Sequence, residues 1–269
     1  MTELASSGKP LLMESMTIKD VEEAMKTTKT VILPVGCVEQ HGWHLPLCTD
    51  ILNATEVAKA ASGATGCLVA PVMPYSYSGG GLLGTINIAP QTVSAVINDI
   101  CISLAQQGFE NIVVLLGHGG SENVRGIRDG LDISIRSHPS LAEAKIALVA
   151  GGLSPTSMEL FKKKDFHAGA SETSRMLYWR PDLVREQRVT DSEEIMEMLR
   201  SDQDAYQRVE RPVDHPMVMP RIRQDERIKI GVLGDPSQAS AELGETIAKE
   251  MLESLVRLIR LMEAASKHH

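Results

Sequence analysis

The segment that decides the fold covers residues 31–50 and reads Val31-Ile32-Leu33-Pro34-Val35-Gly36-Cys37-Val38-Glu39-Gln40-His41-Gly42-Trp43-His44-Leu45-Pro46-Leu47-Cys48-Thr49-Asp50. Its first five residues are apolar, which predicts a buried strand over residues 30–35. One glutamate, two histidines and one aspartate follow within the same segment. Carboxylate and imidazole groups suit zinc, manganese and iron, whereas calcium sites take oxygen ligands. The segment therefore predicts a strand that leads directly into metal ligands.

Strands alternate with helices along most of the remaining chain. Apolar runs predict strands over residues 67–72, 111–116 and 145–150, with a further β-type run over 85–88. Helical spacing of apolar residues predicts helices over 50–61, 91–107 and 121–137, one that starts near Ser171, and a long amphipathic helix over 239–262. Ser121 is expected as the N-cap of its helix. This alternation predicts an α/β fold, a three-layer α/β/α sandwich with a mostly parallel central sheet.

Residues 185–227 give weaker signals because they are rich in charge and interrupted by proline. We expect a short helix over 193–199 and irregular structure after it. We also expect one domain over residues 1–269, with residues 1–15 and 264–269 as peripheral tails. The terminal Lys267-His268-His269 is either a native tail or a tag remnant and carries no argument.

Composition narrows the class of protein. The chain has 269 residues, of which 43% are hydrophobic, enough for a sizeable core. Its net charge of −8 argues against nucleic acid as a partner. No apolar run approaches the roughly 20 residues of a membrane span, and no signal peptide is visible at the N-terminus. We therefore expect a cytoplasmic protein with no membrane partner.

The four cysteines contain no C-x-x-C pair, which argues against a structural zinc ribbon. A chain of this length does not need disulfides, so we interpret the cysteines as reduced thiols. Cys37 and Cys48, which flank the ligand segment, are expected as small buried side chains.

Glu39, His41 and Asp50 are the first candidate ligands. Glu39 and His41 lie two residues apart, so in an extended segment both side chains share a face. Asp50 starts the following helix, where the helix N-terminus favours a carboxylate. Each residue alone could be a surface residue or a plain cap. Their convergence after one buried strand favours a ligand site, since ligands of open parallel sheets bind at the carboxyl ends of strands.

His118 follows the strand over residues 111–116 and lies between glycines, which let the backbone and a ligand approach closely. A third cluster contains His167 and Glu172, although alone it could be an ordinary capped helix start. The three clusters supply three carboxylates and two or three histidines, more than one catalytic zinc needs. This inventory fits a two-metal site in which one aspartate bridges and a shared hydroxide attacks a carbonyl.

Other catalytic templates fit less well. The chain has no H-E-x-x-H helix and no phosphate-binding G-x-x-x-x-G-K-[ST] loop. It has no G-x-S-x-G elbow, so Ser121 is a poor serine nucleophile. The Gly79-Gly80-Gly81 run lacks the strand-to-helix context of a dinucleotide loop.

The chain resembles the creatininase (creatinine amidohydrolase) family in a set of motifs spread in order from about residue 31 to residue 236. The matching motifs are Pro34-Val35-Gly36, Glu39-Gln40-His41-Gly42, His44-Leu45-Pro46, Thr49-Asp50, Gly84-Thr85, Gly117-His118-Gly119-Gly120, His167-Ala168-Gly169, Glu172-Thr173-Ser174 and Gly234-Asp235-Pro236. Each piece is short, but the combination is specific.

The resemblance implies two divalent metal ions per subunit, with zinc expected and manganese or iron as alternatives. One ion would be held by Glu39, Asp50 and His118, and the other by His41, Asp50 and Glu172, with Asp50 bridging. A homo-oligomer, a hexamer in this family, is implied as well.

Two further histidines receive roles by resemblance. His167 matches the family's non-ligand histidine, which hydrogen-bonds substrate or shuttles a proton. His44 belongs to the motif without being a ligand, and we expect it to orient the site through hydrogen bonds.

Three positions depart from the family pattern. Trp43 replaces a common proline, Ser121 a common asparagine, and Gly120 an acidic residue of creatininase. Creatininase also stacks its ring substrate on tryptophans near the catalytic histidine, where this chain offers only Phe161 and Phe166. The departures imply a substrate other than creatinine. Our candidates for substrate contacts are Trp43, Tyr77, Gly119, Gly120 and Ser121.

The sequence thus predicts a metal-dependent hydrolase of a small cyclic amide, lactam or formamide. One alternative is a metal-dependent hydrolase or lyase of a cyclic ketone or sugar-derived ring. An alternative of another class is a non-catalytic metal- or nucleotide-binding protein on the same fold.

Overall fold

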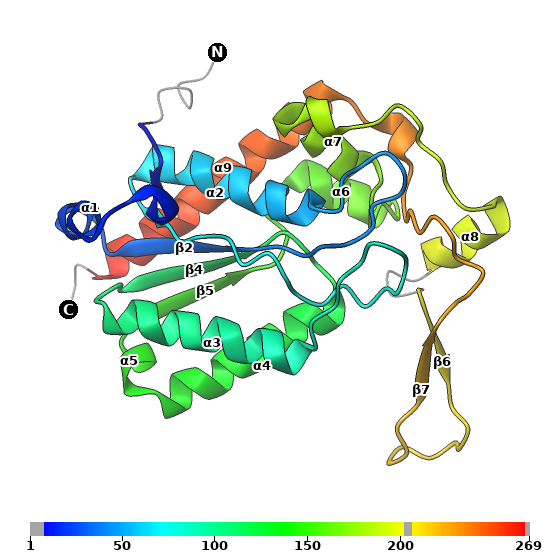
Figure 1. Ribbon diagram of the computed structural model, residues 1–269, viewed down its shortest axis with the longest axis horizontal. Helices are drawn as coiled ribbons and strands as arrows, with labels where there is room; N and C mark the ends of the chain where they lie inside the picture. The colour runs from blue at the N-terminus through cyan, green and yellow to red at the C-terminus, as the bar shows by residue number, and fades with distance from the viewer. Residues whose placement is uncertain (1–7, 202–205, 267–269) are drawn as a thin grey trace.

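A five-stranded parallel sheet forms the centre of the computed structural model, which describes residues 8–201 and 206–266 (Figure 1). The strands are β1 (Leu11–Leu12), β2 (Thr30–Val35), β3 (Leu68–Val69), β4 (Asn111–Leu116) and β5 (Lys145–Val149). Their order is β1-β3-β2-β4-β5, and every neighbouring pair is parallel. The predicted parallel sheet is confirmed.

Helices cover both faces of this sheet (Figure 1). One layer contains α2 (Thr49–Thr65), α6 (Pro155–Lys162), α7 (Ala170–Trp179) and α9 (Ala241–Ser266). The other contains α3 (Pro90–Gln106), α4 (Ser121–Ser137) and α5 (Pro139–Ala142). Outside the layers lie α1 (Ile18–Ala24), α8 (Glu193–Ser201) and the short 3-10 turns Met13–Ser15, Pro181–Leu183 and Pro236–Gln238. The three-layer architecture and the short helix after residue 192 are therefore confirmed.

The apolar run of β2 explains why both faces are covered. Successive side chains of a strand point to opposite faces. Val31 and Leu33 pack in one core with Ile97 of α3, whereas Ile32 packs in the other core with Val57 of α2. Because every position of β2 after Thr30 is apolar, the strand needs a helix layer on each side, and the two cores provide it.

The segment after Cys67 is less regular than predicted. The strand expected over residues 67–72 is only Leu68–Val69. The chain still runs beside β2, because Ala70 N donates to Ile32 O and Met73 N to Pro34 O, each at 2.9 Å. Pro71 has no N–H to contribute to a ladder. The β-type run over 85–88 is also wrong as a strand, since Ile86 forms only an isolated bridge with Val38.

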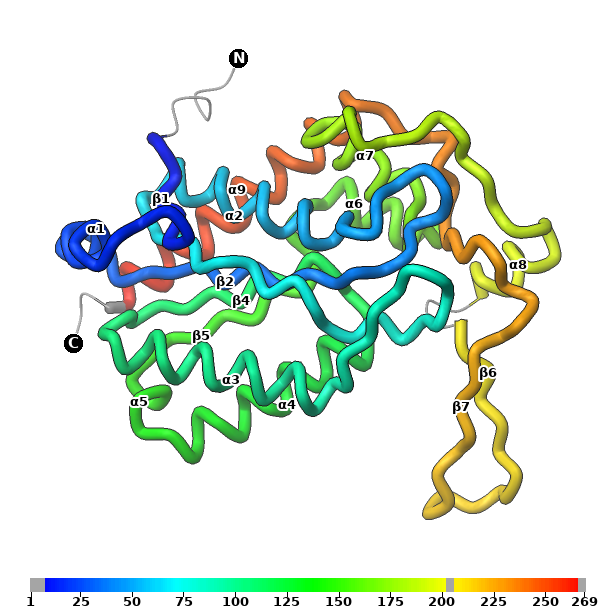
Figure 2. The backbone as a smooth tube through the Cα atoms, viewed as in Figure 1, coloured from blue at the N-terminus to red at the C-terminus, as the bar shows by residue number. Residues whose placement is uncertain are grey.

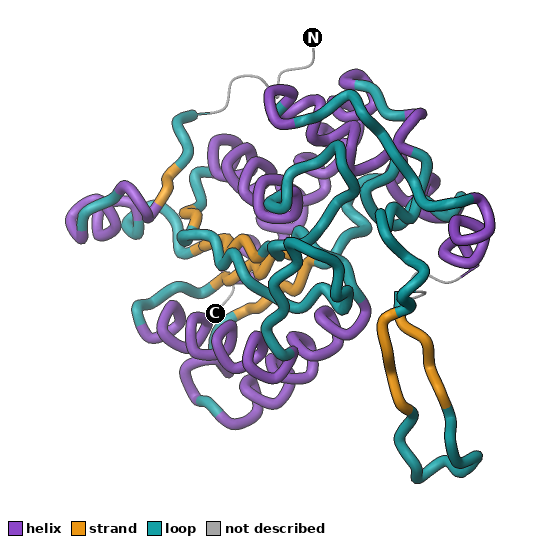
Figure 3. Tube along the Cα trace, turned by 45° about the vertical axis from the view of Figure 1, so that its right-hand side comes forward, coloured by secondary structure: helices purple, strands orange, loops and turns teal. Residues whose placement is uncertain are grey.

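Two segments gain structure that the sequence did not predict. Leu11–Leu12, expected as part of a tail, forms the edge strand β1 beside β3. Residues after α8, expected as irregular, form an antiparallel hairpin of β6 (Gln207–Glu210) and β7 (Arg221–Gln224). Figure 3 shows this hairpin projecting from the body of the molecule. The terminal Lys267-His268-His269 lies outside the described residues.

The helices that follow the adjacent strands β2 and β4 lie on opposite faces of the sheet. After β2 the chain enters α2 on one face, and after β4 it enters α4 on the other face (Figure 2). Such a switch point opens a crevice at the carboxyl ends of the strands. Within the described residues, none of the helices is long and apolar enough to cross a membrane.

Candidate metal centre

Glycines let the start of α2 close onto the ends of β2 and β4. A Cβ atom at Gly36 would lie 2.5 Å from Cγ1 of Ile51, and one at Gly117 would lie 2.0 Å from the carbonyl oxygen of Asp50. No side chain fits at either position. The first turn of α2, which begins at Thr49, therefore places Asp50 between the two strand ends.

His118, Glu39 and Asp50 form one group of possible ligands. His118 Nδ1 lies 2.9 Å from Glu39 Oε2 and 3.4 Å from Asp50 Oδ2. The Ser78 hydroxyl donates to the other oxygen of Glu39, Oε1, at 2.8 Å. That hydrogen bond orients the carboxylate and leaves Oε2 facing the histidine.

His41, Glu172 and the second oxygen of Asp50 form another group. His41 Nε2 lies 3.4 Å from Asp50 Oδ1 and 3.6 Å from Glu172 Oε2. His41 Nδ1 lies 3.1 Å from the carbonyl oxygen of Glu39, to which it donates. This bond fixes the tautomer in which Nε2 carries the lone pair that a metal needs. Asp50 thus faces both groups, one oxygen to each.

Charge in this buried cluster is balanced between carboxylates and imidazoles. Burial alone would lower the pKa of His41, but Asp50 and then Glu172 raise it to about 10. Burial likewise opposes the charged form of His118, yet Glu39 and Asp50 hold its pKa well above the ordinary value. In turn, burial would raise the pKa of Asp50, but His41 and His118 keep it well below its usual range. Without metal, protonated histidines compensate the carboxylates.

The residues fit a pair of divalent cations. Glu39 Oε2, His41 Nε2 and Asp50 Oδ2 are buried, and none has a hydrogen-bond partner in the described part of the chain. Single ligand atoms of His41, Asp50 and Glu172 all lie within 4.8 Å of one another. Buried polar atoms rarely stay without partners. Close atoms that converge without hydrogen-bonding are the arrangement that a cation satisfies.

His167 lies beside both groups. Its ring centre is 4.3 Å from that of His41, and its Nδ1 is 3.9 Å from Glu172 Oε2. Its Nε2 lies 2.8 Å from the carbonyl oxygen of Gln40 and 3.3 Å from the Gln40 side-chain nitrogen. The shorter contact favours Nε2–H as the donor to the carbonyl. Nδ1 is then left as a proton acceptor.

His44 lies outside the ligand groups. Its Nε2 is 2.9 Å from the Thr173 hydroxyl and 3.1 Å from the carbonyl oxygen of Ala168. Burial lowers the pKa of His44 to about 4, so it is neutral. Ala168 has a φ of 50°, and its N–H donates to Glu172 Oε2 at 2.7 Å. His44 therefore supports the turn that orients Glu172.

Of the two cysteines near the ligand segment, one matches the expectation. Cys37 is buried, and burial raises the pKa of its thiol to about 12. Cys48 is exposed, so its prediction as a buried side chain is wrong. Cys48 occupies the N-cap position of α2, at the surface end of the loop. All four cysteines are free thiols.

A cavity of about 470 Å³ opens beside the cluster. Three of the expected contact residues, Gly119, Gly120 and Ser121, line it. Trp43 and Tyr77 are not among its lining residues, and their contact with substrate stays a prediction. Trp43 follows Gly42, whose φ is +66°, and its side chain is 56% exposed.

Sequence reasoning missed other residues of the cavity wall. Arg175 and Tyr206, which the sequence analysis did not name, line it as well. Arg175 could have been found, because it lies one helical turn after Glu172. Tyr206 gave no signal, since it reaches the site from 39 residues further along the chain than His167. Two helix starts also differ slightly: Gly120 rather than Ser121 is the N-cap of α4, and α7 begins at Ala170.

The family model for creatininase (creatinine amidohydrolase) matches residues 14–259. The chain belongs to the creatininase family. Creatinine amidohydrolase of Pseudomonas putida is 31% identical over 203 residues, which is 68% of this chain and 77% of that protein. The mycofactocin precursor peptide peptidase of Mycobacterium ulcerans is 30% identical over 246 residues, covering 87% and 85%. The 3-dehydro-scyllo-inosose hydrolase of Thermotoga maritima is 25% identical over 192 residues, covering 67% and 60%.

Solved creatininase structures share the fold of this chain. One named as creatininase with Mn superposes with a TM-score of 0.73 at 27% identity, covering 94% of this chain and 98% of the other. A mutant creatininase of Zn-Zn type gives 0.72 at 28% identity with the same coverage. The creatininase-like fold predicted from the motifs is therefore confirmed.

Proposed function

We propose that this creatininase-family, metal-dependent hydrolase cuts a C–N bond beside a carbonyl in a small cyclic amide, lactam or formamide. The observation that carries the proposal is the position of Asp50, whose two carboxylate oxygens face different histidines, His41 and His118. A single carboxylate placed between two ligand groups is the arrangement of a bridged two-metal site.

Glu39, Asp50 and His118 would hold one cation, and His41, Asp50 and Glu172 the other. Two divalent cations supply Lewis-acid polarisation of a carbonyl and lower the pKa of water. Zinc suits these mixed nitrogen and oxygen ligands, as do manganese and iron. The manganese and Zn-Zn forms of creatininase support this assignment.

His167 would move the proton. With Nε2–H donated to the Gln40 carbonyl, Nδ1 can accept a proton from the attacking water and deliver it to the leaving nitrogen. Gln40 is itself fixed, because its side-chain nitrogen donates to Tyr206 Oη at 3.0 Å and to the Gly231 carbonyl at 3.2 Å. The hydrogen bond to the Gln40 carbonyl thus holds the imidazole in one orientation.

The comparisons support an amide-like substrate. Two relatives at about 30% identity are named for an amidohydrolase and a peptidase activity, and both cut C–N bonds. Phe161 and Phe166, the aromatic residues of the segment in which creatininase has tryptophans, line the cavity, which favours a substrate other than creatinine. The 3-dehydro-scyllo-inosose hydrolase relative keeps a sugar-derived ring as the second candidate.

We also propose that the chain is one domain and assembles as a homo-oligomer, a hexamer by family resemblance, in the cytoplasm. Light scattering on the purified protein measures the assembly. A monomer at micromolar concentration would contradict it.

The proposed function is tested by an activity screen of protein loaded in turn with zinc, manganese and iron. The substrates are lactams, hydantoins, formamides, short peptides and ring ketones. We expect turnover of at least one cyclic amide or formamide. Turnover of ring ketones alone would favour the second candidate. No turnover of any of them would favour a non-catalytic metal-binding protein.

A further inference from the structure

Arg175 stands out among the residues that line the cavity. It lies on α7, three residues after Glu172, and its side chain is only 12% exposed. It is the only arginine among the described residues of the lining, which include no lysine. Among these lining residues, Arg175 is therefore the one whose side chain carries a permanent positive charge.

The hydrogen-bonding capacity of Arg175 is poorly used. One Nη2–H donates to Glu172 Oε1 at 3.5 Å, which is the long limit of a hydrogen bond. Nε is buried and lacks a partner in the part of the chain that the structure describes. A buried donor without an acceptor is destabilising, and more so on a charged group. A planar oxyanion could accept from Nε and one Nη together.

Glu172 does not depend on Arg175 for its position. Its Oε2 accepts from the Ala168 N–H at 2.7 Å and faces His41. The other carboxylates of the cavity wall have closer partners of their own. Asp165 accepts from the N–H groups of Ala170 and Ser171, at 2.8 and 2.9 Å. Glu122 accepts from the hydroxyl of Ser121 at 3.0 Å.

Apolar side chains surround this part of the cavity. Leu153, Met158 and Phe161, from the end of the sheet and from α6, line it together with Met251 of α9. Charge-assisted hydrogen bonds are stronger where the surroundings exclude water. The wall therefore combines one underused guanidinium with a surface that suits an organic ligand.

We propose that Arg175 anchors a carboxylate of the substrate, so that the natural substrate is a small amide or lactam bearing a carboxylate close to the bond that is cut. The inference rests on the proposed hydrolase function. Closeness follows from Glu172, which contacts Arg175 through Oε1 and faces His41 through Oε2. An anion held by Arg175 lies a few bonds from a carbonyl placed at the metals.

Binding of inert probes tests the anchor without turnover. Cyclopentanecarboxylate and nitrocyclopentane have nearly the same shape, but only the first carries a charge. Their affinities are measured by calorimetry on the full chain, both loaded with zinc and after chelator treatment, because carboxylates also bind metals. Arg175→Gln should weaken the carboxylate at least tenfold, about 1.4 kcal/mol, in both states and leave the nitro compound unchanged. Arg175→Lys should fall between.

Arg180→Gln is the matched control, since Arg180 follows the same helix but pairs with Asp182 at the surface. It should bind both probes like the parent protein. Zinc content is measured for every variant. It shows whether Arg175 binds the carboxylate of the probe or instead holds the metal ligand Glu172 in position. Unchanged carboxylate affinity in Arg175→Gln, or loss of zinc from it, would overturn the proposal and make Arg175 a positioning residue for Glu172.

The two proposals fail separately. If no amide is turned over while carboxylate affinity depends on Arg175, the anchor stands and the reaction is wrong. If neutral lactams are turned over equally well by the parent and by Arg175→Gln, the reaction stands and the anchor is wrong.

Discussion

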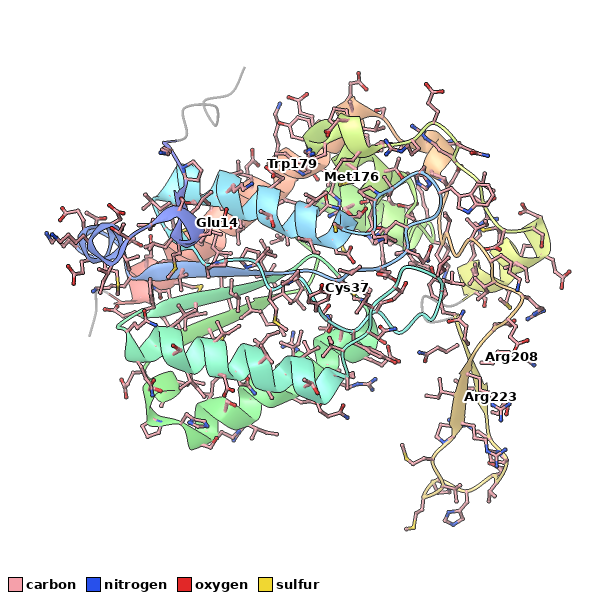
Figure 4. All side chains as sticks on the ribbon, in the orientation of Figure 1. Glu14, Cys37, Met176, Trp179, Arg208 and Arg223 are labelled. Atoms are coloured by element: carbon pink, nitrogen blue, oxygen red, sulfur yellow. The ribbon has the colours of Figure 1, made fainter. Side chains whose placement is uncertain are left out.

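The carboxyl ends of β2 and β4 differ sharply from the β6–β7 hairpin. The strand ends hold a ligand cluster, defined as Glu39, His41, Asp50, His118, His167 and Glu172, in which four side chains are buried and the other two are largely so. At its base, the hairpin contacts the body through hydrogen bonds of Gln207 to the Gly79 carbonyl and of the Gly81 N–H to Gln224. Beyond the base its side chains lie in solvent, as Arg208 and Arg223 show in Figure 4. In the cluster, close contacts join residues distant in sequence, as between His118 and Glu39 and between His41 and Glu172. In the hairpin, the main partner of each strand is the other strand.

This contrast predicts that substitutions in the cluster affect stability and metal binding more than substitutions in the hairpin do. The cluster places charges out of water, so removing one of them leaves its partners uncompensated. The hairpin buries little, so its exposed residues contribute little to stability.

Asp50→Ala should have the largest effect. It removes the carboxylate that faces both ligand groups, so we expect loss of both metals and at least a thousandfold lower kcat. Mass spectrometry of the bound metal and steady-state kinetics measure the two effects. Glu56→Ala is the control, because Glu56 lies on the same helix and pairs with Lys59 near the surface. Unchanged metal content in Asp50→Ala would refute the bridged site.

His167→Ala should separate chemistry from metal binding. We expect both metals to remain and turnover to fall by about 10²–10⁴, the usual contribution of a general acid or base. His138→Ala, at the exposed end of α4, serves as the control. If His167→Ala loses a metal, His167 is a ligand and the proton has another carrier.

The pH dependence of stability tests the charge balance of the cluster. The pKa of His41 is raised from 6.5 to about 10, so its protonated form stabilises the metal-free fold. This contribution is fully present below pH 6.5 and is lost as the pH rises towards 10. The Tm of chelator-treated protein should fall across that window. In the zinc-loaded protein the fall should be smaller, because the ligand imidazoles are already neutral.

The matched variant for this experiment is His41→Asn, in which the decline of Tm above pH 6.5 should be weaker. A Tm of the chelated parent protein that rises with pH over the same range would contradict the charge balance described for His41 and Asp50.

Substitutions at the hairpin tip should have the smallest effect. Met217 and Met219 are 88% and 81% exposed. Changing both to serine should alter the free energy of unfolding by less than about 0.5 kcal/mol and leave metal content unchanged. Denaturant titration measures the first and metal analysis the second. A large loss of either would show that the tip is buried by a partner or coupled to the cluster.

The sequence predicted the cluster better than the hairpin for a physical reason. β2 and β4 are continuous apolar runs buried on both faces, so composition alone marks them. The candidate metal ligands come directly after these strands, and the carboxyl ends of parallel strands meet at one edge of the sheet. Each hairpin strand has a single apolar residue, Val209 or Ile222, and both are exposed. Backbone pairing without burial leaves no periodic pattern to detect.

The lining of the cavity was harder to predict than the ligands, for a related reason. Trp43 departs from the family pattern and lies between His41 and His44, yet it is not among the residues that line the cavity. Its direction depends on the positive φ of Gly42, which the spacing of residues does not reveal. Tyr206 reaches His167 only through the packing of a distant segment, with ring centres 6.0 Å apart. Chain positions that converge through loops cannot be found from one sequence.

The most direct test of the two-metal site is anomalous diffraction from crystals of the zinc-loaded protein at the zinc absorption edge. We expect two peaks, one on each side of Asp50. One should lie within about 2.0–2.2 Å of ligand atoms of Glu39 and His118, and the other at that distance from His41 and Glu172. A single peak, or two peaks of which neither is bound by Asp50, would contradict it.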